Sequence, residues 1–176
     1  MKIIYISDIH FGLSKEENQG KVLKSFFEDV SSQVKDCEPS TLYLIISGDL
    51  VQNADATGIY DLFHQNFMTP LLSGTRVPLN NVVIIPGNHD LQRSEVIQIK
   101  DIYFPMLDKK MNEAEFNNLI HNDRSRDILF SKFNAFNKYA STVMGEVYNE
   151  KSFGIDLKNG WGLFCLNSAI FFFWRS

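Results

Sequence analysis

The chain has 176 residues, 44% of them hydrophobic and 22% charged, which is typical of one globular domain with a sizeable core. Its formal net charge of −4 excludes a bulk electrostatic attraction to nucleic acid or to an anionic membrane, leaving only a local basic patch for such contacts. The apolar run near the N-terminus is too short for a signal peptide, and the stretch 160–174 is too short for a membrane span. Cys37 and Cys165 are expected to be reduced thiols, so we expect a cytoplasmic protein without a membrane partner.

Three runs in the first half of the chain are almost continuously apolar, at 2–7, 41–47 and 81–86. Such runs predict strands that are buried on both faces of a sheet. Apolar residues at helical spacing between them predict helices over 16–35 and 57–72, which gives a β-α-β-α-β order with parallel strands. The predicted apolar stripes are Val22, Phe26, Val30 and Val34 in the first helix and Tyr60, Phe63, Phe67 and Leu71 in the second.

The second half of the chain has a different pattern. Residues 95–144 contain no strand signal and several helical patterns, so we expect a helical excursion within a single domain that spans 1–176. Two further strands are predicted at 152–157 and 162–167, joined as a hairpin by the turn at 158–160. The predicted fold class is therefore α/β, with a mainly parallel first sheet and a helical insertion.

Polar residues follow each of the three buried strands. In a parallel α/β sheet the carboxyl ends of the strands lie along one edge, where ligands bind, so these residues are expected to meet there. Gly48 and Gly87 permit the tight turns that this requires. The residues are Asp8 and His10 after the first strand, Asp49 after the second, and Asn88, His89 and Asp90 after the third.

Carboxylate, imidazole and amide groups together suit a divalent metal such as Mn, Fe or Zn. Each motif also has a plainer interpretation: the pair Asp8 and His10 is weak alone, Asp49 can be a helix N-cap, and 87–90 can be only a turn. The occurrence of all three on buried strands favours a metal site. Of the other histidines, His64 is predicted to be structural and His121 to be exposed to solvent.

The segments "YISDIHFG", "LIISGDLV" and "VVIIPGNHD" resemble the first three motifs of the calcineurin-like metallophosphoesterases. The resemblance is good over residues 2–92 and continues weakly at "GLFCLNSA", residues 162–169. It implies an α/β/β/α sandwich and a metal-dependent phosphoesterase that hydrolyses phosphomonoesters or phosphodiesters with a hydroxide activated by two metal ions. The substrate can be a nucleotide, a nucleic acid or a small phosphate ester, and the sequence does not choose among them.

The same resemblance implies a role for each motif residue. Asp8 and His10 would bind the first metal ion, and Asp49 would bridge both ions. Asn88 would bind the second ion and contact a phosphoryl oxygen of the substrate. His89 would be the general acid or stabilise the charged transition state, and Asp90 would orient His89 or its loop. The implied metal is Mn, with Fe or Zn as alternatives.

The sequence also departs from the family pattern. The family completes its site with further downstream histidines, including a GHxH-type motif, whereas this chain has no histidine after His121. We therefore expect a weak second metal site, poor activity and a truncated sandwich whose first sheet keeps an uncovered apolar face, open to self-association. The alternative function is a degenerate or truncated phosphoesterase-fold module that acts in binding or assembly without catalysis.

Overall fold

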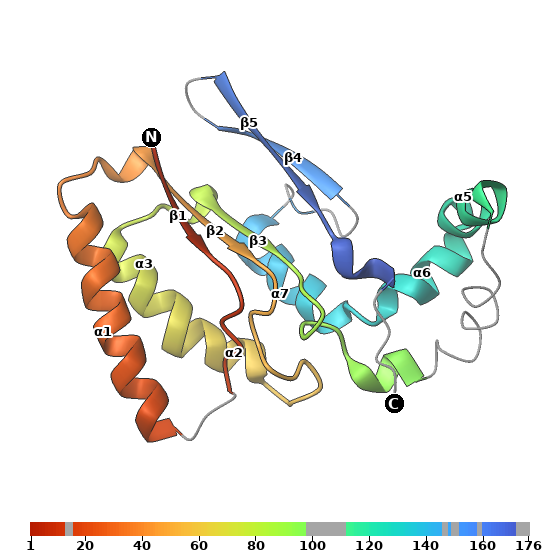
Figure 1. Cartoon of the computed structure of the whole chain (residues 1–176), viewed down its shortest axis with the longest axis horizontal. Helices are drawn as coiled ribbons and strands as arrows, with labels where there is room; N and C mark the ends of the chain where they lie inside the picture. Colours follow the sequence, from red (N-terminus) through yellow and green to blue (C-terminus); the bar gives the residue numbers. More distant parts are fainter. Residues whose placement is uncertain (13–15, 98–111, 146–147, 149–151, 158–159, 172–176) are drawn as a thin grey trace.

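A three-stranded parallel sheet lies at the centre of the computed structural model, which describes residues 1–12, 16–97, 112–145, 148, 152–157 and 160–171 (Figure 1). Its strands are β1 (Lys2–Ile6), β2 (Leu42–Ser47) and β3 (Val82–Ile85), in the order β1-β2-β3. All pairings are parallel, so the predicted α/β class and the β-α-β-α-β order are confirmed.

Helices cover one face of this sheet. They are α1 (Glu16–Val34), the continuous run of α2 (Ile59–Phe63), the π-helical turn η2 (His64–Met68) and α3 (Thr69–Thr75), and α7 (Asn134–Met144). The predicted stripe of the second helix is buried throughout, as expected. The short 3-10 turns η1 (Pro39–Thr41) and η3 (Leu79–Asn81) lead into β2 and β3. The core that these elements share with the sheet includes Leu44, Ile46, Ile84, Phe63, Phe67, Phe136 and Ala140.

The predicted stripe of the first helix is wrong at its N-terminal end. Val22 is 68% exposed, whereas Phe26 and Val30 pack partly against the core and Val34 is buried. Residues spaced by four drift by about 40° per step around an α-helix, so a stripe that faces the core at Val34 has rotated outward by Val22. Leu23 packs against the core instead.

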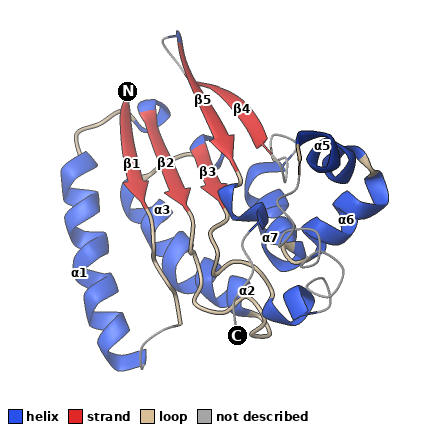
Figure 2. Ribbon diagram, turned by 45° about the vertical axis from the view of Figure 1, so that its right-hand side comes forward, coloured by secondary structure: helices blue, strands red, loops and turns tan. Residues whose placement is uncertain are grey.

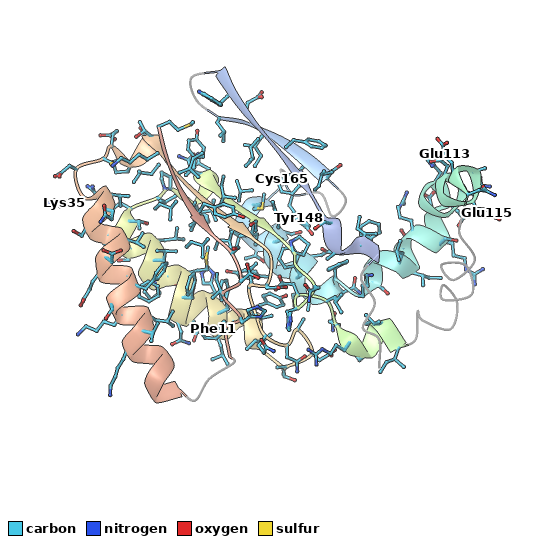
Figure 3. The ribbon with its side chains drawn as sticks, in the orientation of Figure 1. Phe11, Lys35, Glu113, Glu115, Tyr148 and Cys165 are labelled. Carbon is cyan, nitrogen blue, oxygen red and sulfur yellow. The ribbon has the colours of Figure 1, made fainter. Side chains whose placement is uncertain are left out.

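A β-hairpin covers part of the opposite face of the sheet. Strands β4 (Ser152–Leu157) and β5 (Trp161–Leu166) pair antiparallel, as the sequence predicts. Phe153 and Cys165 of the hairpin pack on Ile45 and Val83, and Figure 3 shows Cys165 at the sheet side of the hairpin. This cover stops short of β1, where Tyr5 is 64% exposed and Ile3 is also exposed.

The helical prediction for 95–144 is met by α5 (Glu113–His121), α6 (Asp123–Ser131) and α7, and residues 93–97 are also helical. Residues 98–111 lie outside the described part of the chain. Asn112 and Asn122 cap α5 and α6, each accepting a backbone N–H with its side chain. Figure 2 shows α5 and α6 at one end of the molecule, away from the sheet. Among the described helices, none is long and apolar enough to cross a membrane.

Candidate metal centre

The loops that follow β1, β2 and β3 are joined by backbone hydrogen bonds. The N–H of Asp8 donates to the carbonyl of Gly48 at 3.2 Å, and the N–H of His10 donates to the carbonyl of Asp49 at 2.9 Å. The N–H of Gly48 in turn donates to the carbonyl of Ile85 at 2.9 Å. The sheet ladder therefore continues past the strand ends, and it fixes the backbone from which the predicted ligands project.

Three of the predicted metal ligands have a left-handed backbone. The φ angles are 55° at Asp8, 46° at His10 and 53° at Asp49, and Arg76 is the other described residue besides glycine with positive φ. This region of φ is uncommon for residues other than glycine, and it costs free energy that the surrounding structure must supply. Strained residues are often found at functional sites. The positive φ angles of these three residues therefore support their interpretation as site residues.

Gly48 and Gly87 let the loops after β2 and β3 approach each other closely. Gly48 has a φ of 93°, and a Cβ on it would lie 3.2 Å from the Cα of Gly87. A Cβ on Gly87 would lie 2.3 Å from Oδ1 and 2.4 Å from the backbone nitrogen of Asp49. Only glycine fits at 87 while Asp49 keeps its place.

Three side chains meet at the centre of these loops: His10, Asp49 and His89. Each offers one ligand atom, and these atoms lie within 4.8 Å of one another. The imidazole rings of His10 and His89 are 4.5 Å apart between centroids and perpendicular, and Nε2 of His10 is 3.8 Å from Oδ2 of Asp49. The resemblance implied that His89 is the general acid or stabilises the charged transition state, and the structure also brings it into this potential ligand group.

The other predicted ligands lie beside this group. Asp8 and Asn88 line a pocket of about 270 Å³ together with Asp49. Asp8 is exposed and Asn88 is half-buried. Ser168 and Ala169, from the short turn η6 (Ser168–Phe171) that follows β5, also line this pocket. Asp8 is not part of the group of His10, Asp49 and His89, and Asp49 belongs to both that group and the pocket.

Asp90 points away from the pocket into the protein. It is fully buried, and its carboxylate accepts the N–H groups of Leu50 (3.1 Å), Val51 (3.3 Å) and Gly87 (2.9 Å). The hydroxyl of Tyr60 donates to Oδ1 of Asp90 at 3.2 Å. Asp90 thus ties the loop after β3 to the loop after β2.

Burial decides the ionisation of this buried pair. It raises the pKa of Asp90 to about 6, against three backbone N–H bonds that lower it, and the nearby Asp49 raises it further. Burial also raises the pKa of Tyr60 well above its ordinary value, and the neighbouring Asp90 carboxylate adds to this effect. Tyr60 therefore stays protonated and donates to Asp90.

His89 is held by one contact of its backbone and one contact of its ring. Its backbone N–H donates to Oδ1 of Asp49 at 2.7 Å, and its Nδ1 lies 3.1 Å from the carbonyl of Gln52. A carbonyl only accepts hydrogen bonds, so this contact requires a hydrogen on Nδ1. Nε2 is then the ring nitrogen that does not contact Gln52.

The residues present fit a divalent metal ion. Nδ1 of His10 is buried and has no hydrogen-bond partner among the described residues, and a buried polar atom in this state costs free energy unless a ligand satisfies it. The donor set of imidazole nitrogen, carboxylate and amide oxygens suits Mn, Fe or Zn. The strained φ angles at Asp8, His10 and Asp49 support the same interpretation.

Two contacts of the site were not predicted from the sequence. Tyr60 lies on an apolar helical stripe, and nothing in that pattern marks its hydroxyl as a partner of Asp90. Ser168 follows the strand at 162–167 just as Asp8 follows β1, and that position was the available signal.

Nδ1 of His64 lies 3.2 Å from the hydroxyl of Tyr139, and His121 is exposed, so both expectations for these histidines are met.

Comparison with known proteins agrees with the motifs. The sequence model of the calcineurin-like phosphoesterases matches residues 1–165. The chain belongs to the calcineurin-like phosphoesterase family. Neither a search among curated proteins nor a search among solved structures gives a significant match. Membership supports a phosphoesterase type of function and a divalent metal cofactor in general, and it adds a reason to interpret the polar edge of the sheet as a metal centre.

Proposed function

We propose that this phosphoesterase-family chain hydrolyses phosphate esters with divalent metal ions held at the carboxyl edge of β1–β3. The observation that carries the proposal is the meeting of His10, Asp49 and His89 within 4.8 Å, on loops whose backbone is strained at His10 and Asp49. Asp8 and His10 would hold the first ion, Asp49 would be shared between two ions, and Asn88 would supply an oxygen to the second. Because the chain has no histidine after His121 to complete the family's ligand set, the second ion would bind more weakly.

Divalent ions bound here would polarise a phosphoryl oxygen and lower the pKa of water. The side chains do the rest of the work in this proposal. Asn88 orients the phosphoryl group in the 270 Å³ pocket that it lines with Asp8 and Asp49. His89 holds a proton on Nε2 and gives it to the leaving oxygen, while Gln52 fixes the ring through Nδ1. Asp90 is buried, so it positions these loops rather than touching substrate.

The substrate class is a phosphomonoester or phosphodiester, including nucleotides. Net charge argues against a bulk affinity for nucleic acid, so small phosphate esters are the first substrates to test. Manganese is the preferred ion in this proposal, with iron or zinc as alternatives. Cys37 and Cys165 are free thiols, which supports the cytoplasm as the place of action.

The test is Mn²⁺ binding by isothermal titration calorimetry, together with Mn²⁺-dependent hydrolysis of aryl phosphate mono- and diesters. Wild type is expected to bind Mn²⁺, and His10→Ala and Asp49→Asn are expected to weaken binding by at least about tenfold, the loss of one good ligand contact. His121→Ala is the matched control, because His121 is exposed on α5 and far from the loops in sequence. Equal Mn²⁺ affinity in wild type and Asp49→Asn would show that the proposed centre is wrong.

A second candidate is a non-catalytic assembly role, which the uncovered strand β1 favours. Ile3 and Tyr5 on β1 and Phe164 and Leu166 on β5 are all exposed apolar side chains. In this candidate the chain associates with a second copy through these side chains. Light scattering over a concentration series tests it: Tyr5→Ser should leave a monomer if the face is an interface, and a monomeric wild type rules the candidate out.

A further inference from the structure

The pocket beside the candidate metal centre has two walls of different origin. One wall carries the predicted ligands Asp8, Asp49 and Asn88, from the loops of the parallel sheet. The other carries Ser168 and Ala169, from the turn η6 that follows β5. A group held against the ligands therefore faces a residue for which the motifs suggest no role.

Ser168 is the polar side chain of this second wall. It is exposed, and its hydroxyl has no hydrogen-bond partner within the described part of the chain. A serine at the surface usually bonds to water, but this one lines the same pocket as two carboxylates and an amide, those of Asp8, Asp49 and Asn88. Its O–H is available to any group that enters the pocket.

The turn that carries Ser168 is held firmly by its neighbours. The side chain of Asn167 is buried and accepts the N–H of Ala169 at 3.1 Å. Ala169 is itself buried in a cluster with Leu91 and Phe133, and the ammonium of Lys132 donates to the carbonyl of Ile170. Because the turn is anchored on both sides of Ser168, its hydroxyl is presented without a large loss of backbone entropy on binding.

The chemistry of the two walls is complementary for a phosphoryl group. The ligand wall is built for cations, and those cations would meet some of the phosphoryl oxygens. An oxygen that points to the other wall needs a hydrogen-bond donor, and a neutral hydroxyl supplies one without competing for the metal ligands.

We propose that Ser168 is a substrate-binding residue whose hydroxyl donates to a non-bridging phosphoryl oxygen in the pocket that it lines with Asn88. This inference rests on the proposed function. It deepens that proposal by adding a contact for the phosphoryl group from the part of the chain beyond the three motifs.

The experiment compares wild type, Ser168→Ala, Ser168→Thr and the control Ser73→Ala. Ser73 is an exposed serine on α3, and the pocket does not include it. Mn²⁺ affinity is measured first by calorimetry, and inorganic phosphate is then titrated into each Mn²⁺-loaded protein. KM and kcat for an aryl phosphate are measured in parallel.

Ser168→Ala is expected to keep the Mn²⁺ affinity of wild type and to raise the Kd for phosphate about tenfold, the effect of losing one hydrogen bond to a charged group. Ser168→Thr keeps the hydroxyl and is expected to restore most of the affinity, and Ser73→Ala is expected to match wild type. KM should rise more than kcat falls, because the contact is made to bound substrate.

Two results overturn the inference in distinguishable ways. If wild type binds Mn²⁺ and phosphate and Ser168→Ala binds phosphate equally well, Ser168 has no part in the site and the proposed function stands. If wild type fails to bind Mn²⁺, the proposed function fails and this inference fails with it.

Discussion

The two walls of the pocket are built by different means. The ligand wall is a set of short loops whose backbones are hydrogen-bonded directly to one another. Three of its residues have a strained backbone, and the buried Asp90 carboxylate accepts a hydrogen bond from the loop after β3. The wall that carries Ser168 is an unstrained turn that is held by side chains, through Asn167, Lys132 and the core around Ala169. The first wall depends on local sequence, whereas the second depends on packing between distant segments.

This difference has a consequence for mutation. Changes in the ligand wall should cost stability and metal affinity together, because the same hydrogen bonds support both. Changes in the second wall should separate the two, because its anchors lie outside the ligand group.

Asp90→Ala should cause the largest loss. It removes the carboxylate that accepts three backbone N–H groups, and it leaves the Tyr60 hydroxyl with only the longer contact to the backbone carbonyl of residue 90, at 3.4 Å. We expect the free energy of unfolding to fall by about 4 kcal/mol and Mn²⁺ binding to be lost with it. Urea denaturation and calorimetry check this, with Asp61→Ala on the exposed side of α2 as the control. A loss no larger than that of the control would contradict the role of Asp90 as the tie between loops.

Gly87→Ala should be the next most damaging change. Its Cβ would overlap Oδ1 and the backbone nitrogen of Asp49, so Asp49 must move out of the ligand group. We expect a loss of about 3 kcal/mol in stability and a collapse of Mn²⁺ affinity. Gly20→Ala in α1 is the matched control, since a Cβ there meets nothing within 4 Å and should stabilise the helix by up to about 1 kcal/mol. Thermal melting of Gly87→Ala and Gly20→Ala, with and without Mn²⁺, measures both stability and metal binding.

Lys132 gives the second wall a pH dependence. Burial lowers the pKa of its ammonium to about 7, whereas the unfolded chain keeps a value near 10.4. Between these values the unfolded chain holds a proton that the folded chain has released, so the stability that depends on Lys132 rises with pH. Relative to Lys132→Met, the free energy of unfolding of wild type should rise by about 1.4 kcal/mol per pH unit from pH 7.5 to 9. The measurement is urea denaturation at several pH values. An equal pH dependence of the free energy of unfolding in wild type and Lys132→Met would contradict this prediction.

The strain in the ligand wall predicts a smaller effect at Asp8. Asp8 is exposed and has a φ of 55°, a conformation that glycine adopts freely and alanine does not. Both Asp8→Gly and Asp8→Ala should weaken Mn²⁺ binding, but Asp8→Gly should be more stable than Asp8→Ala by about 1 kcal/mol. Denaturation of the two variants without metal measures the difference. Equal stabilities would mean that the backbone at this position relaxes without cost.

The contrast between the walls also explains what the sequence could predict. The buried strands and the polar residues at their ends are encoded in contiguous stretches, so the sheet, its parallel order and the residues at its edge were predictable. The contact of Tyr60 with Asp90 joins a helix to a loop 30 residues away, and no local pattern specifies it. Ser168 meets the ligand wall only through folding of the intervening chain. Val22 faces solvent because residues spaced by four rotate steadily around an α-helix, so a stripe predicted from that spacing alone does not stay on one face.

Helix α7 has a consequence for the order in which the protein assembles. Phe136, Tyr139, Ala140 and Val143 belong to the same core as the three parallel strands, although they follow the last motif by more than 40 residues of sequence. During synthesis all three motifs leave the ribosome while the apolar surface that α7 buries is still open to water. A nascent chain at that stage exposes apolar strands. We expect it to be open to chaperones and proteases until residue 144 has emerged.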